Sequence, residues 1–158
     1  MKTLSILVGM FLWFGAETAS SDCRQNSIGQ VYCGKGKCVA NSIGQVYCSK
    51  YQNGGAATDS IGQTVCGKGE CVISNIGQVY CSTVIGAGAA VDSIGQPKCG
   101  RGQCIRDSIG QVYCSNIPSG GASLNSIGQV QCEGGCSPGD SSLCENPGST
   151  HCESNPAR

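Results

Sequence analysis

The stretch that decides the fold is residues 38–48, which read CVANSIGQVYC. At its centre, Asn41 suits the first position of a type I turn, and Gly44 suits the left-handed position that closes a three-residue hairpin loop with a G1 bulge. This loop places Cys38 opposite Cys48 on two short strands rich in β-branched residues. We therefore predict an antiparallel β-hairpin in which two cysteines face each other.

The hairpin is one copy of a repeat. The tripeptide Ile-Gly-Gln occurs seven times, at intervals that alternate between 15 and 18 residues, so the full unit has 33 residues in two unequal halves. Such periodicity is typical of stacked or strip-like repeat proteins. We predict an all-β fold of disulfide-rich antiparallel hairpin repeats with little or no helix, either a flat meander or a β-solenoid-like coil. The repeats occupy residues 22–131, and a Cys-rich tail follows at residues 132–158.

Alternation along the two strands assigns the side chains to opposite faces. Cys38, Ala40, Val46 and Cys48 share one face, which we expect to form a thin interior lined by disulfides. Tyr47 lies on the other face, which we expect to be half exposed.

The first residues have the layout of a secretory signal peptide, predicted here as residues 1–20. Lys2 precedes an apolar run from Leu4 to Phe14, and small and polar residues follow. This run is too short to span a bilayer, which needs about 20 residues, so no membrane span is expected. We expect the protein to be secreted, or periplasmic in a bacterium.

The chain beyond the signal peptide holds few large apolar side chains, because every Met, Phe and Trp lies within residues 1–20. Burial of so little apolar surface does not offset the conformational entropy of folding, which makes covalent cross-links necessary. All 14 cysteines lie beyond the signal peptide, and an even number in an exported chain indicates up to seven disulfides. The candidates are Cys23, Cys33, Cys38, Cys48, Cys66, Cys71, Cys81, Cys99, Cys104, Cys114, Cys132, Cys136, Cys144 and Cys152.

Four hairpins bring two cysteines face to face in the same register, whereas three hairpins oppose a cysteine with alanine. Those three cysteines need other partners, either across a Gly-rich loop, as in Cys66 with Cys71, or in another unit or the tail. The sequence leaves the connectivity open. The facing pairs are Cys23 with Cys33, Cys38 with Cys48, Cys71 with Cys81 and Cys104 with Cys114, and the alanine pairs are Ala56 with Cys66, Ala89 with Cys99 and Ala122 with Cys132.

Tyrosine recurs at 33-residue spacing, at Tyr47, Tyr80 and Tyr113. If the units stack in register, these rings form a column on which sugar rings can stack, with the hydroxyls free for hydrogen bonds. The alternative is that tyrosine, as the largest side chain present, covers a thin core.

Basic residues recur at the same spacing, at Lys35, Lys68 and Arg101, each inside a Cys-Gly-x-Gly-x-Cys loop. A cationic edge of this kind is suited to acidic polysaccharide or to other phosphate-bearing components of a cell envelope. The alternative is a set of solvated loop tips.

Other classes of function find little support. Lys plus Arg equals Asp plus Glu at 10 each, which does not favour nucleic acid as a partner. His151 is the only histidine, and no Ser–His or Cys–His pair recurs with the repeat. The cysteine spacings do not match zinc modules. We expect no catalytic site, no metal and no cofactor.

The segments DSIGQVYC (107–114), CGKGEC (66–71) and NGGAATDS (53–60) resemble short secreted Cys-rich repeat proteins of microbes that carry no assigned activity. The Asx-x-x-Gly-x-Val pattern is also similar to the strand–turn–strand repeats of YD or Rhs proteins, although their Tyr-Asp pair is absent. The likeness covers roughly residues 22–136. It implies a secreted β-repeat protein and transfers no functional residues.

The sequence thus predicts a secreted, non-enzymatic repeat protein that acts as an extracellular structural or binding module. One alternative is glycan or cell-envelope binding through the tyrosines. Another is a virulence or defence factor, such as a toxin or protease inhibitor, that uses the loops at residues 51–55 and 116–121, which differ between copies while the hairpins stay the same.

Overall fold

The computed structural model describes residues 22–156, so the predicted signal peptide lies outside the described residues. The chain forms seven antiparallel hairpins, and a 3-10 turn at Ser141–Leu143 is the only helical element in this range. No helix within it is long and apolar enough to cross a membrane. The first strands of the hairpins are β1 (Asp22–Gln25), β3 (Cys38–Ala40), β5 (Ala56–Thr58), β7 (Cys71–Ile73), β9 (Ala89–Val91), β11 (Cys104–Arg106) and β13 (Ala122–Leu124). The second strands are β2 (Val31–Gly34), β4 (Val46–Ser49), β6 (Thr64–Cys66), β8 (Val79–Ser82), β10 (Pro97–Cys99), β12 (Val112–Ser115) and β14 (Val130–Cys132).

Each hairpin turn has the predicted geometry. In the turn between β3 and β4, Asn41 Oδ1 accepts hydrogen bonds from the backbone N–H of Ile43 (3.1 Å) and of Gln45 (2.9 Å). Gly44 has a φ of +82°, the left-handed conformation that closes the G1 bulge. The predicted all-β repeat fold and its register are confirmed, because these local bonds fix both.

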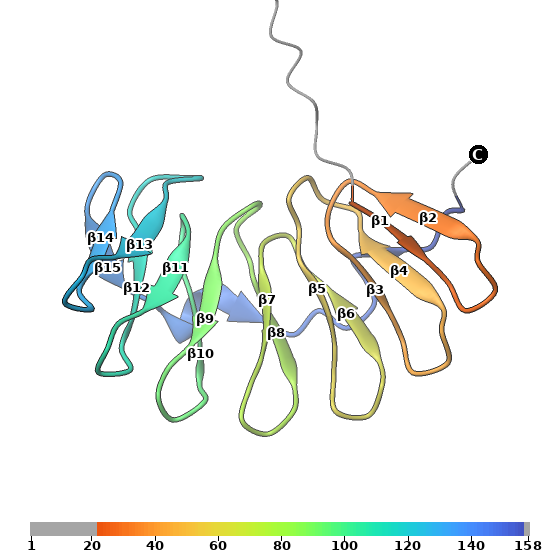
Figure 1. Ribbon diagram of the computed structural model, residues 1–158, viewed down its shortest axis with the longest axis horizontal. Coiled ribbons are helices and arrows are strands. Elements are labelled where there is room, and N and C mark those ends of the chain that lie inside the picture. The colour runs from red at the N-terminus through yellow and green to blue at the C-terminus, as the bar shows by residue number, and fades with distance from the viewer. Residues whose placement is uncertain (1–21, 157–158) are drawn as a thin grey trace, which may run out of the picture.

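The hairpins do not join into one sheet but stack face to face, first strands beside first strands and second beside second (Figure 1). At the turn end, each turn hydrogen-bonds to the next, as where the N–H of Ser42 donates to Gly62 O (3.3 Å). A side chain on Gly62 would place its Cβ 2.5 Å from the Cβ of Ser42, so glycine is needed for the close approach as well as for its φ of +85°. Stacking in register is the solenoid-like alternative, although the strand hydrogen bonds lie within hairpins rather than between coils.

The interior is the thin, disulfide-lined layer that the alternation predicts. Cys38, Val46 and Cys48 are buried, and Tyr32 of the preceding hairpin packs against them. Buried serines add polar links at the opposite end of the hairpins, as where Ser49 Oγ donates to Gly67 O (2.7 Å). The stack is therefore held by pairwise contacts between neighbouring hairpins rather than by one central core.

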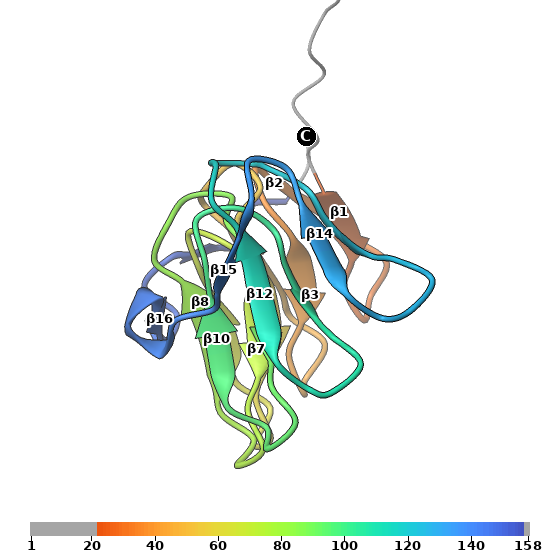
Figure 2. The ribbon, with the colours of Figure 1, turned by 90° about the vertical axis from the view of Figure 1, so that its left-hand side faces the viewer.

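The tail forms a strap, residues 136–156, that runs back along the stack from β12 to β2. Strands β15 (Cys136–Pro138), β16 (Cys144–Glu145) and β17 (Cys152–Glu153) pair with β12, β8 and β4. Isolated bridges join Asp140 to Cys99 and Pro156 to Tyr32. Figure 2 shows the strap on the side of β8, β10 and β12. The strap therefore occupies the outer edge of the second strands.

Every hairpin has one disulfide, and every cysteine is paired. The four facing pairs are confirmed as bridges within hairpins, whereas the three cysteines opposite alanine all bond to the tail. Cys66 pairs with the strap rather than with Cys71, which excludes the bridge across the Gly-rich loop. The bridges are Cys23–Cys33, Cys38–Cys48, Cys71–Cys81, Cys104–Cys114, Cys66–Cys152, Cys99–Cys144 and Cys132–Cys136.

Candidate functional site

The predicted tyrosine column lies on the second strands, at every second hairpin. Tyr47, Tyr80 and Tyr113 belong to β4, β8 and β12, and the intervening strands β6 and β10 carry Val65 and Lys98 at the same position. The three side chains are half-buried. Their hydroxyls donate to Gln45, Gln78 and Gln111 at 3.1, 3.0 and 2.9 Å, so each already has a partner. A role for these rings in binding stays a prediction.

Two of the tyrosines line hollows beside the strap. A hollow of about 560 Å³ next to Tyr47 is also lined by Thr64 and Asn146, and one of about 370 Å³ next to Tyr113 is lined by Lys98 and Pro138. Each hollow combines one aromatic ring with hydrogen-bonding groups. This is the kind of surface that suits an uncharged sugar.

The predicted basic ladder lies at the opposite end of the hairpins from the turns. Lys35 and Arg101 are exposed, and Lys68 Nζ lies 5.9 Å from the centroid of the Tyr51 ring. Two other lysines bind the strap instead, as where Lys98 Nζ donates to Ser141 Oγ (3.0 Å). Binding of acidic polysaccharide by the ladder stays a prediction.

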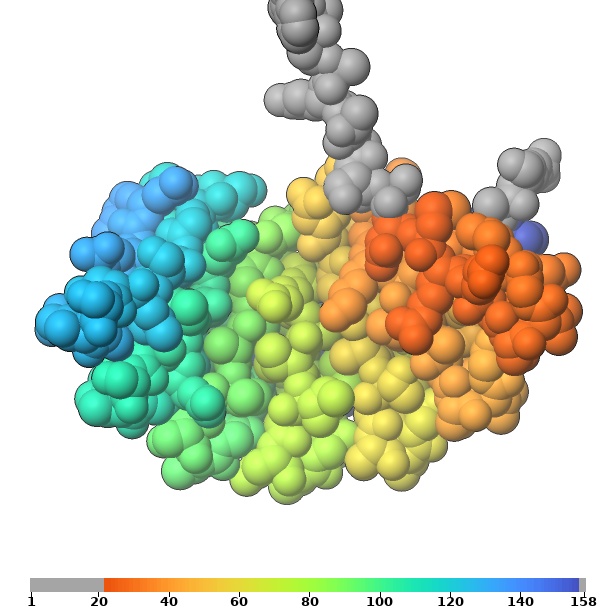
Figure 3. Space-filling model, viewed as in Figure 1, coloured from red at the N-terminus to blue at the C-terminus, as the bar shows by residue number. Residues whose placement is uncertain are grey.

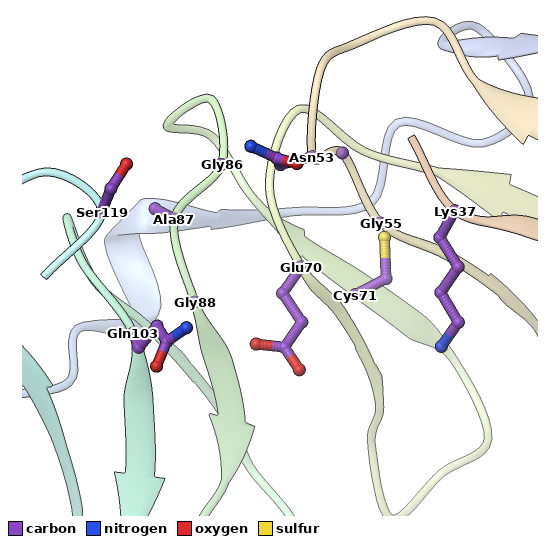
Figure 4. Close-up of a pocket in the computed structure, with 11 residues that line it drawn as sticks. Lys37, Asn53, Gly55, Glu70, Cys71, Gly86, Ala87, Gly88, Gln103 and Ser119 are labelled. Atoms are coloured by element: carbon purple, nitrogen blue, oxygen red, sulfur yellow. The ribbon is translucent and has the colours of Figure 1, made fainter. Parts of the chain in front are cut away.

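A cavity of about 540 Å³ opens beside the connecting loops, and sequence reasoning missed it (Figure 4). Lys37, Glu70 and Gln103 line it at 33-residue spacing, which is the signal that could have located it. One cation, one carboxylate and one amide at equivalent positions provide no repeated ligand chemistry. Glu70 Oε2 also accepts a hydrogen bond from the N–H of Ala89 (3.3 Å), which makes this carboxylate part of the fold.

The loops that vary between copies border the same cavity. Asn53 belongs to the loop at residues 51–55 and Ser119 to the loop at residues 116–121, and both residues line the cavity. Both have positive φ values, 55° and 60°, as does the equivalent Gly86. The three loops thus share one backbone shape and differ in side chains. Their use as contact loops of a toxin or inhibitor stays a prediction.

His151 lies on the strap, between it and the loop that follows β4. Its Nε2 lies 3.8 Å from Glu145 Oε1, and its ring meets that of Tyr51 edge-on, with centroids 5.1 Å apart. Among residues 22–156 no group of three or more His, Cys, Asp or Glu side chains is placed to hold a metal ion. The contacts of His151 join the strap to a loop.

A row of exposed isoleucines at the turn end is the second feature that sequence reasoning missed. Each hairpin turn carries one isoleucine, between 63% and 77% exposed. The signal was present in the Ile-Gly-Gln tripeptide, which the sequence analysis used only to find the repeat. We call this set the isoleucine row: Ile28, Ile43, Ile61, Ile76, Ile94, Ile109 and Ile127.

Comparisons with protein-family models, curated proteins and solved structures found no match to this chain.

Proposed function

We propose that the protein is a secreted, non-enzymatic module that presents a rigid repeated surface outside the cytoplasm. The observation that carries this proposal is the distribution of the disulfides, one for each hairpin, with Cys66–Cys152 and Cys99–Cys144 fastening the strap. Disulfides form and persist in oxidising compartments. Here they hold together a stack whose apolar interior is thin, so the fold depends on such a compartment.

The non-enzymatic part is supported by the surroundings of the reactive side chains. All 14 cysteines are in disulfides, so none is available as a thiolate nucleophile. The sole histidine, His151, contacts Glu145 and Tyr51 rather than a serine hydroxyl. The repeated hairpins provide a scaffold and a surface.

The experiment combines a disulfide map with protease digestion. We expect the exported protein to contain no free thiol, to yield the seven pairs as non-reduced peptides, and to resist trypsin until a reductant is added. Free thiols, or equal digestion before and after reduction, would contradict the proposal. Any turnover lost in His151→Gln, with the disulfide map unchanged, would contradict its non-enzymatic part.

A second candidate function is glycan binding, favoured by the hollows beside Tyr47 and Tyr113. We expect retention on chitin, cellulose or peptidoglycan that is lost when Tyr47, Tyr80 and Tyr113 are all changed to Ala. Tyr51→Ala is the matched control, because that ring packs against His151 instead. Equal retention of the triple variant and the natural chain would dismiss this candidate.

A further inference from the structure

The isoleucine row is not required by the hairpins that display it. In a turn such as residues 59–63, Asp59 Oδ1 caps the backbone, and Gly62 takes the left-handed conformation. Ser60 links the turn to the next one through its backbone N–H. Ile61 uses only its backbone N–H, which any residue except proline supplies, and its side chain is 75% exposed. The fold therefore gives no reason for an isoleucine at this position.

Comparison among the seven copies shows that the isoleucine has nevertheless stayed constant. On the second strands, the position of Tyr47 has become Val65, Lys98 and Gln131 in other copies. Isoleucine occupies all seven turns, followed each time by glycine and glutamine. Copies that have diverged at half-buried positions have kept an exposed apolar side chain. We infer that the row contacts something.

The shape of the turn end limits what that partner is. The five turns from β3–β4 to β11–β12 follow a convex lower edge in Figure 1, and Figure 3 shows this edge as separate knobs. Two copies meeting along convex edges would touch at only a few turns. Even full contact would cover about 500 Å² of apolar surface per copy, from ~100 Å² for each exposed aliphatic side chain. A stable interface needs about 800 Å² per partner.

The charge of the turns narrows the choice further. From the residue that opens each turn to the glutamine that closes it, there is no Lys or Arg in any copy, whereas Asp59, Asp92 and Asp107 are present. An anionic surface is repelled by these carboxylates. The glutamine amides provide uncharged hydrogen-bonding groups beside the apolar tips. Knobs that insert one by one into a deformable apolar layer do not need a matching rigid surface.

We propose that the isoleucine row docks the protein on lipid bilayers with zwitterionic headgroups. The isoleucine tips enter the outer acyl region, and the glutamine side chains lie among the headgroups. This inference rests on the proposed function and deepens it, because it names the surface that the secreted module meets.

The test measures partitioning onto phosphatidylcholine vesicles by flotation. Burial of one exposed isoleucine contributes about tenfold to partitioning, so the double variant Ile76→Ser, Ile94→Ser is expected to bind about 100-fold more weakly. The matched control is Ile85→Ser, Ile117→Ser, at side chains 59% and 44% exposed in the connecting loops at the other end of the hairpins. This control is expected to bind like the natural chain. Replacing part of the lipid with phosphatidylglycerol is expected to weaken binding.

Three results would overturn the proposal. They are a natural chain that stays unbound at the highest lipid concentration, equal binding by the two double variants, and a dimer that depends on Ile76 and Ile94 without vesicle binding. The disulfide map and the trypsin digestion are run on the same samples. If both remain as expected while vesicle binding fails, the lipid proposal fails and the proposed function stands.

Discussion

Removal of the bridge between hairpin β5–β6 and the strap, by Cys66→Ala with Cys152→Ala, is expected to destabilise the protein by about 4 kcal/mol. The bridge spans 86 residues of sequence. Because Cys99–Cys144 remains, the shortest loop that the bridge closes is roughly 40 residues, for which the chain-entropy relation gives about 4 kcal/mol. Guanidinium unfolding followed by tyrosine fluorescence measures the loss. The control is Cys23→Ala with Cys33→Ala, a separation of 10 residues, for which about 2.7 kcal/mol is expected.

Hydrogen exchange locates the effect along the strap. The N–H of Lys50 donates to His151 O (2.9 Å), and the N–H of Thr83 donates to Leu143 O (2.9 Å). Without the bridge, the strap is free beside β4 but still fastened by Cys99–Cys144 near Leu143. Lys50 is therefore expected to lose protection while Thr83 keeps most of its own. Unchanged protection at Lys50, or equal loss at both amides, would refute the idea that each bridge anchors its own part of the strap.

Two further predictions concern the turns. Gly62→Ala is expected to cost more stability in guanidinium unfolding than Gly29→Ala, because both glycines have φ near +85° but only at Gly62 does a Cβ meet Ser42, at 2.5 Å. Gly29→Ala should cost about 1–2 kcal/mol from its backbone conformation alone, and equal losses would contradict the steric argument. The pKa of Asp140 lies below its ordinary value, because the backbone N–H of Ser142, and then its hydroxyl, hydrogen-bond to the carboxylate. Its stabilisation of the 3-10 turn is therefore present above the ordinary carboxyl pKa and lost as pH falls through the lowered one. The amide shift of Ser142 should report this transition, and Asp140→Asn should abolish it.

The hairpins were predictable because everything that defines them is local. The turn at Asn41 and Gly44 sets the register, and the register alone places Cys38 opposite Cys48. The tail was not predictable in the same way. The sequence showed that Cys66 needed a distant partner, but the choice of Cys152 depends on a strap that crosses several hairpins on its return. That route is set by the second-strand edges, which exist only once the hairpins have stacked.

The candidate site shows a similar limit. The sequence analysis grouped residues by the 33-residue period, whereas the stack repeats structurally once per hairpin, at alternating steps of 15 and 18 residues. Val65 and Lys98 therefore lie between the tyrosines in the row that they share. The isoleucine row follows the hairpin period in all seven copies. Its exposure was visible only once the turns had been placed at the outer end of the stack.

An open stack of hairpins has two free strand edges, and the structure protects them differently. The strap pairs with the second strands. On the first strands, carboxylates accept edge N–H groups, as Asp22 does from Cys38 (2.8 Å) and Glu70 from Ala89 (3.3 Å). Covered or charged edges oppose the addition of a further strand from another chain. A partner is therefore expected to meet side chains rather than strand edges, and among the described residues the isoleucine row is the apolar set that recurs in every hairpin.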